Sequence, residues 1–170
     1  MIREYGPIFL IPAAWITTLI VMFMDFSAYW VQHMHYFMLV FLVGFTVLSW
    51  NKMKEDPVLD IWRKVIAFGV VFTLFGALSF HFTGYSKFLG SLSMFYWLIA
   101  PGIGCYRSAF YMKENSESYR VVGFAGTLAL FLVTLGLISG RNIGVIVGIL
   151  LATVSQSYSI LVAAKMDGTI

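Results

Sequence analysis

Three histidines, His33, His35 and His81, are the residues of this sequence best suited to hold a ligand. Imidazole is the side chain most often used to bind haem iron or a transition metal inside a helical bundle. A haem b held by two histidines needs one ligand from each of two facing helices, and an imidazole N–H can also bind the polar head of a quinone. We therefore take the three histidines as the candidate cofactor-binding residues, with haem b, a metal ion or a quinone as the alternative ligands.

The spacing of the histidines limits how they can share a ligand. His33 and His35 are two positions apart, which is about 200° around a helix, so at most one of them can face His81. The other must face lipid head groups or another helix. Asp25 precedes this region, and its carboxylate could orient an imidazole by accepting the second ring N–H, or could simply end the first helix.

A second interpretation of the histidines needs no ligand. Four aromatic residues surround them, namely Tyr29, Trp30, Tyr36 and Tyr85. Trp and Tyr gather where membrane helices meet water, so the histidines could be half-solvated members of an interfacial aromatic belt. The sequence leaves both interpretations open.

A weaker candidate site is a polar cluster of Arg107, Gln156 and Ser159. Gln156 and Ser159 share a helix face at i, i+3 spacing, and Arg107 lies near the end of an apolar stretch. Interhelical hydrogen bonds explain such a cluster as well as a ligand site does. The apolar stretches otherwise lack Lys, Arg, Asp and Glu, which argues against proton pumps, voltage sensors and many ion-coupled transporters.

Familiar catalytic motifs are missing from the sequence. It contains no Gly-rich phosphate loop after a strand, no Gly-x-Ser-x-Gly and no His-Glu-x-x-His. The single cysteine, Cys105, lies in an apolar run and reads as a small core residue. We expect no enzymatic turnover by this chain alone.

The elements that must position these residues are membrane-spanning helices. Apolar residues make up 60% of the 170 positions and charged residues 11%, whereas globular domains have about 45–50% and about 25%. A small soluble domain could not cover so much apolar surface. The sequence thus predicts an all-α, polytopic integral membrane protein and no nucleic-acid partner. Six apolar stretches are each close to the ~20 residues that cross a bilayer: 7–24, 28–50, 62–83, 88–112, 121–139 and 142–164.

Basic residues predict the orientation of this six-transmembrane-helix bundle. With the N-terminus in the cytoplasm, nine of the eleven Lys and Arg residues fall on the cytoplasmic side, and only Lys87 and Arg141 fall outside. Both termini are then cytoplasmic, and the chain forms a single transmembrane domain, residues 1–170, in the cell membrane. In this topology all three histidines lie near the outer surface.

Two packing features stand out. Small residues recur every four positions at Gly140, Gly144, Gly148 and Ala152. Such a stripe lets helices approach closely in lipid, either within the bundle or between subunits. Pro101 lies late in the fourth stretch, where it removes one backbone hydrogen bond and is expected to kink or loosen the helix.

Function follows only in outline from these features. We expect an integral membrane subunit of a larger membrane complex, with the lipid bilayer and other membrane subunits, or copies of itself, as partners. A redox-linked role in electron transport would use the histidine site. The alternatives are a non-catalytic structural or assembly subunit and a protomer of a small-solute transporter or channel.

Overall fold

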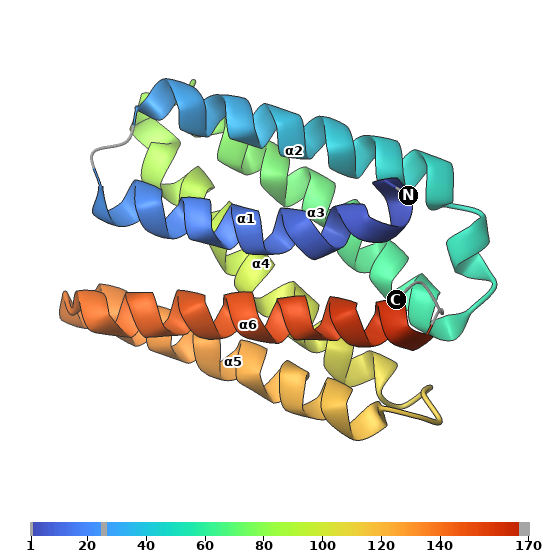
Figure 1. The fold of residues 1–170 in the computed structure, drawn as a ribbon. Helices are drawn as coiled ribbons and strands as arrows, with labels where there is room; N and C mark the ends of the chain where they lie inside the picture. The colour runs from blue at the N-terminus through green and yellow to red at the C-terminus, as the bar shows by residue number, and fades with distance from the viewer. Residues whose placement is uncertain (1, 25–26, 167–170) are drawn as a thin grey trace. The chain divides into compact units, whose positions relative to one another are not determined.

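The computed structural model describes residues 2–24 and 27–166, and this part of the chain is all-helical. It contains six α-helices and two short 3₁₀ turns, and no strand occurs in these ranges. In chain order the elements are α1 (Ile2–Phe23), α2 (Ala28–Ser49), η1 (Lys52–Lys54), α3 (Pro57–Leu78), η2 (Thr83–Tyr85), α4 (Ser86–Ser108), α5 (Ser116–Ser139) and α6 (Asn142–Met166) (Figure 1). The predicted fold class, all-α with membrane-length helices, is confirmed at this level.

In the part of the chain that the structure describes, five helical segments are long and apolar enough to cross a membrane. They are α2, α3, the stretch Thr83–Ser108 that includes α4, α5 and α6. In α1 the apolar segment found among the described side chains, Leu10–Phe23, is shorter than a full span. Helices are the expected form because a helix pairs its backbone N–H and C=O groups within its own segment, where lipid offers no partner.

The third helix occupies a different stretch from the one that hydropathy predicts. It begins at Pro57, because Asp56 caps it: the Oδ1 atom of Asp56 accepts hydrogen bonds from the backbone N–H of Val58 at 2.8 Å and Leu59 at 2.9 Å. It ends at Leu78, several residues before the predicted end at position 83. The hydropathy window follows the apolar residues and does not detect the cap. His81 therefore lies in a turn and not in the last turn of a helix.

The described chain divides into two compact units, and each is described by itself. The first unit contains residues 1–24 and 101–170, and the second contains residues 25–100. The boundary within α4 falls at Pro101, where the helix nevertheless continues to Ser108.

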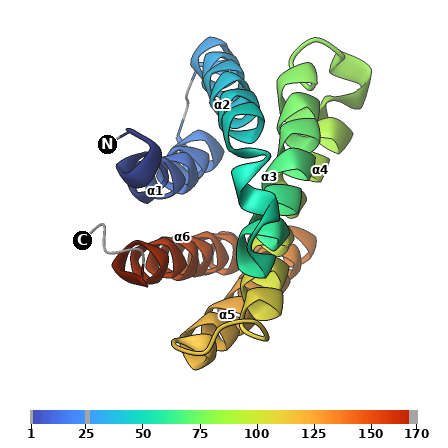
Figure 2. The ribbon, with the colours of Figure 1, turned by 90° about the vertical axis from the view of Figure 1, so that its right-hand side faces the viewer.

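In the first unit α5 and α6 form a closely packed antiparallel hairpin (Figures 1 and 2). Gly140 ends α5 in the left-handed conformation, with φ 66°, and has open space around it. Gly144 and Gly148 face α5 so closely that a Cβ atom on Gly148 would lie 2.8 Å from the carbonyl oxygen of Ala129. Ala152 is fully buried. Three members of the predicted small-residue stripe thus lie on the buried side of α6, and Gly140 forms the turn.

The other contacts of the first unit also rely on small or polar residues. Helix α1 packs on α6, where the Nε1 atom of Trp15 donates a hydrogen bond of 2.9 Å to the Oε1 atom of Gln156. The end of α4 meets α5 at Gly102 and Gly123, where a Cβ atom on Gly123 would lie 2.9 Å from the carbonyl oxygen of Gly102. Close backbone approach of this kind is typical of helix packing in membranes.

In the second unit α3 packs against α2 and contacts the first part of α4. The Tyr96 hydroxyl donates to the carbonyl oxygen of Val65 at 2.5 Å, and the Nε1 atom of Trp97 donates to the hydroxyl of Thr73 at 3.0 Å. Gly69 lies directly beneath the Trp97 ring. These contacts fix α3 between its neighbours and so place the turn that carries His81.

Candidate functional site

His81 forms a hydrogen-bonded cluster with two residues of α2. Its Nε2 atom lies 2.5 Å from the Tyr36 hydroxyl and 3.0 Å from the Nε2 atom of Gln32. Gln32 in turn donates to the Tyr36 hydroxyl at 2.8 Å. Gln32 and Tyr36 are one helical turn apart, so both project from the same face of α2 toward the turn after α3. We call these three residues the Gln32–Tyr36–His81 cluster.

The donors and acceptors of the cluster define which protons it holds. An amide nitrogen can only donate, so Gln32 supplies an N–H and the Tyr36 oxygen accepts it. Gln32 Nε2 also lies 3.0 Å from His81 Nε2, so this ring nitrogen accepts in that contact and the Tyr36 O–H can donate to it as well. The proton of that ring is on Nδ1. No described residue forms a hydrogen bond with Nδ1, and His81 is exposed, so this N–H can donate to a ligand.

His33 is directed elsewhere. Its Nδ1 atom lies 2.7 Å from the carbonyl oxygen of Tyr29, one turn earlier on α2, and its ring packs on the Tyr29 ring with 4.0 Å between centroids. Both side chains are exposed. His33 therefore fits the interfacial aromatic belt that the sequence suggests as the alternative interpretation.

His35 faces α3 and α4 and not the turn that carries His81. Its Nδ1 atom lies 2.9 Å from the carbonyl oxygen of Val31. Its ring packs against Gly76 on α3, where a Cβ atom would lie 2.6 Å from the ring and 2.8 Å from the Ser93 hydroxyl. Gly76 is needed here because any larger residue would collide with the imidazole. No space remains between the ring and α3 for a flat macrocycle.

The three predicted histidines thus belong to the same compact unit but do not converge on one point. Neither His33 nor His35 hydrogen-bonds His81 in the described part of the chain, and no group of three His, Cys, Asp or Glu residues there could hold a metal ion. Asp25, the predicted orienting acid, lies outside the described residues. The arrangement suits hydrogen bonding through His81 better than iron coordination by a histidine pair.

The predicted polar cluster is brought together in part. Gln156 and Ser159 are both buried on α6, and the Ser159 hydroxyl donates to the Gln156 carbonyl oxygen at 2.7 Å. The Tyr119 hydroxyl of α5 donates to the carbonyl oxygen of Ser159 at 3.2 Å. Arg107 is exposed on α4, and the described hydrogen bonds of Ser159 do not include it. The Tyr119–Ser159 bond joins α5 to α6 and the Trp15–Gln156 bond joins α1 to α6, which is the interhelical role that the sequence allows.

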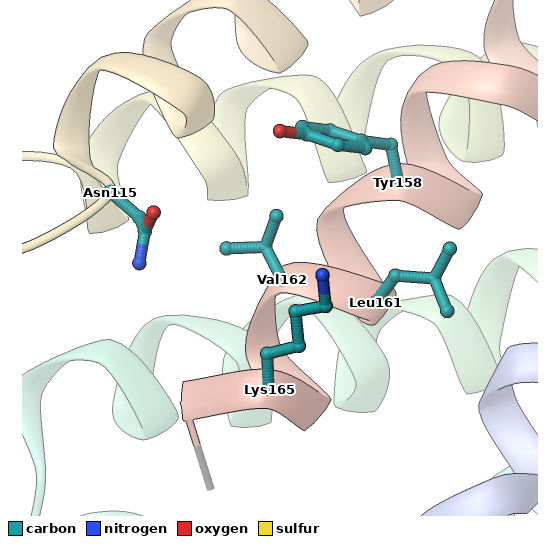
Figure 3. A pocket seen from close by; sticks show the side chains of 5 residues that line it. All are labelled: Asn115, Tyr158, Leu161, Val162 and Lys165. Atoms are coloured by element: carbon teal, nitrogen blue, oxygen red, sulfur yellow. The ribbon is translucent and has the colours of Figure 1, made fainter. Parts of the chain in front are cut away.

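A hollow of about 260 Å³ lies beside the end of α6. Its lining is Asn115, Tyr158, Leu161, Val162 and Lys165, and the ends of the Lys165 and Tyr158 side chains point into it (Figure 3). Asn115 precedes α5 in the left-handed conformation, with φ 58°, which is uncommon for a residue other than glycine. The hollow is open and mixed in character, and the sequence pattern does not indicate it.

Sequence reasoning overlooked Gln32 and counted Tyr36 only as a belt residue. The available signal was their i, i+4 spacing on a helix that also carries the histidines, which places an amide and a phenol on one face. Comparison of this chain with protein-family models, with curated proteins and with solved structures finds no match.

Proposed function

We propose that this chain is an integral membrane subunit of a larger membrane complex that binds the polar head of a quinone-like ligand at the Gln32–Tyr36–His81 cluster. The observation that carries the proposal is the hydrogen bond between Tyr36 and His81, with Gln32 donating to the same hydroxyl. This arrangement leaves the Nδ1–H of His81 exposed, while the Tyr36 hydroxyl donates to the other ring nitrogen. A quinone carbonyl needs such a donor, and its reduced form needs a proton acceptor nearby.

The surroundings of the cluster also support a ligand with an apolar tail. Large exposed aromatic side chains lie next to it in sequence, on the first turns of α2 and on the turn after α3: Tyr29, Trp30, Phe82 and Tyr85. They offer flat apolar surface at the end of helices long enough to span a membrane. A quinone ring could stack on such surface while its tail lies along the helices.

The proposal includes a topology of six spans in the cell membrane with both termini cytoplasmic. Its support is the nine-to-two distribution of basic residues together with five membrane-length helices and the apolar segment in α1. In this orientation the cluster lies near the outer face.

Ligand binding to the purified protein in lipid nanodiscs tests the proposal. Decylubiquinone titrated into the sample should quench tryptophan fluorescence in a saturable manner. His81→Ala should weaken binding roughly two- to tenfold, the range expected for one lost hydrogen bond. His33→Ala is the matched control, because His33 is an exposed imidazole of the same region that lies outside the cluster. Equal weakening by both variants, or no saturable quenching, would reject the site.

Haem b remains the competing ligand and has a direct readout. A purified preparation with a Soret band that disappears in His81→Ala would replace the quinone proposal with a haem proposal. A haem b held by two histidines would lose the band in His33→Ala or in His35→Ala as well.

A structural or assembly role is the alternative function, and one observation favours it. Helix α2 exposes apolar side chains along its length: Phe37, Val40, Val47 and Leu48 are between 63% and 85% exposed. Another subunit could pack there as well as lipid. Native mass measurement in mild detergent would reject this role if the chain is found alone and monomeric. The third alternative, a transporter or channel protomer, is not favoured, because Gln156 and Ser159 are buried in helix contacts.

A further inference from the structure

The junction between α2 and α3 carries a cluster of basic side chains around one tryptophan. Trp50 ends α2, and the guanidinium carbon of Arg63 lies 4.4 Å from the centroid of its ring. The Lys54 ammonium lies 5.8 Å from the same ring. Both distances fall within the range of cation–π attraction, which holds the two cations beside the indole.

The acidic side chains of the junction are largely engaged by other groups. The Asp60 carboxylate accepts from Arg63 at 2.5 Å and from Lys64 at 2.6 Å. The Asp56 carboxylate caps α3 by accepting from two backbone N–H groups. Lys52 and Lys54 are exposed, and in the described part of the chain no carboxylate lies within ion-pair distance of either. Four basic side chains, Lys52, Lys54, Arg63 and Lys64, exceed the three acidic ones, Glu55, Asp56 and Asp60, so the junction carries a net charge of +1.

Exposed apolar side chains precede these ammonium groups in the sequence, at the end of α2. Val47 and Leu48, one turn before Trp50 on α2, are 69% and 85% exposed. Trp50 itself is 38% exposed. Free cations at the end of a membrane-length helix, next to exposed aliphatic side chains and an indole, match the two halves of a phospholipid: an anionic head group and acyl chains.

We propose that this junction binds the phosphate head group of an anionic phospholipid. Lys52 and Lys54 contact the phosphate, and Trp50 holds the Lys54 side chain in place. The acyl chains lie along Val47 and Leu48. The phospholipid site requires helices that span a membrane, but it does not depend on which leaflet the junction occupies. It also does not depend on the Gln32–Tyr36–His81 cluster, so failure of one proposal leaves the other standing.

The test is lipid retention by the full-length protein, measured by native mass spectrometry in mild detergent. The protein is titrated with phosphatidylglycerol and, separately, with phosphatidylcholine. We expect phosphatidylglycerol to bind more tightly than phosphatidylcholine. Each lysine replaced should weaken phosphatidylglycerol binding about fivefold, which is the attraction that one surface lysine contributes to an anionic lipid. The double variant Lys52→Gln, Lys54→Gln should therefore bind phosphatidylglycerol about 25-fold more weakly.

A matched control removes the same amount of charge elsewhere. Lys87→Gln, Arg141→Gln replaces two exposed basic residues that are not part of the junction. Retention of phosphatidylglycerol should be unchanged in this variant. Equal weakening in both double variants would show general charge attraction and overturn the site, as would equal retention of the two lipids by the native protein.

Two further measurements distinguish a phospholipid site from a free-anion site and probe the indole. Ten-millimolar inorganic phosphate should displace phosphatidylglycerol poorly, because it lacks acyl chains; complete displacement would assign the site to a free anion and overturn the lipid proposal. Trp50→Ala should weaken phosphatidylglycerol binding without changing the helical circular dichroism spectrum. Unchanged binding in a folded Trp50→Ala protein would contradict the role given to the indole.

Discussion

Replacement of Gly148 by alanine should destabilise the packing of α5 against α6. A Cβ atom at this position would lie 2.7 Å from Val133 Cγ2, 2.8 Å from the carbonyl oxygen of Ala129 and 2.9 Å from the backbone nitrogen of Val133. Two of these atoms belong to the α5 backbone, so they cannot move aside by rotating a side chain. The helices must separate, and overpacking of this kind costs about 1–3 kcal/mol.

The helix propensity of alanine acts in the opposite direction. Alanine is favoured over glycine in a helix interior by about 0.5–1 kcal/mol. The net effect of Gly148→Ala should therefore be a loss of about 1 kcal/mol in the free energy of unfolding, obtained as the difference between the midpoints of the two ranges. Thermal unfolding in detergent, followed by tryptophan fluorescence, should show a midpoint several degrees lower.

Gly44→Ala is the matched control for this experiment. Gly44 lies inside α2, and no atom comes within 4 Å of a Cβ placed there. The same substitution should be neutral or raise the unfolding midpoint, since only the propensity term remains. The reasoning fails if Gly148→Ala is as stable as the native protein, or if both variants shift the midpoint in the same direction by the same amount.

Three other predictions follow from single contacts and from the charge pattern. Trp15→Phe and Gln156→Leu should each lower the free energy of unfolding by about 0.5–1.5 kcal/mol. The double variant should lose less than the sum of the two, because both single changes remove the same buried hydrogen bond. Full additivity in thermal unfolding would contradict this prediction. Asp56→Ala should lower the free energy of unfolding by about 1 kcal/mol, because it removes the cap of α3, whereas Asp56→Asn should retain most of that stability. Equal losses in the two variants, measured by chemical denaturation, would mean that the cap contributes little. In a variant lacking the native cysteine, a cysteine at Lys87 should react with an impermeant maleimide on intact cells and one at Lys113 should not; the reverse labelling would refute the proposed orientation.

The sequence by itself determined that the chain consists of membrane-length helices. Composition and hydropathy indicate whether each segment lies in lipid or in water. In lipid a segment forms a helix, because a helix pairs its own backbone N–H and C=O groups. The apolar stretches therefore located α2 and α6 closely, whereas α5 begins at Ser116, ahead of its predicted start at 121. Helix α3 also starts earlier than predicted, because the Asp56 cap and Pro57 set its start and the apolar run did not. Caps act through one side chain, so a window average does not detect them.

Only the tertiary structure decided which polar side chains meet. Trp15 and Gln156 are 141 positions apart, and no pattern in either helix indicates that one donates to the other. The candidate site changed for the same reason: the histidines belong to one compact unit, but their positions around α2 direct His33 to Tyr29 and His35 to Gly76. Periodicity specifies which residues share a helix face. The neighbour of that face depends on close packing between helices, which placed Gln32 and Tyr36 against His81.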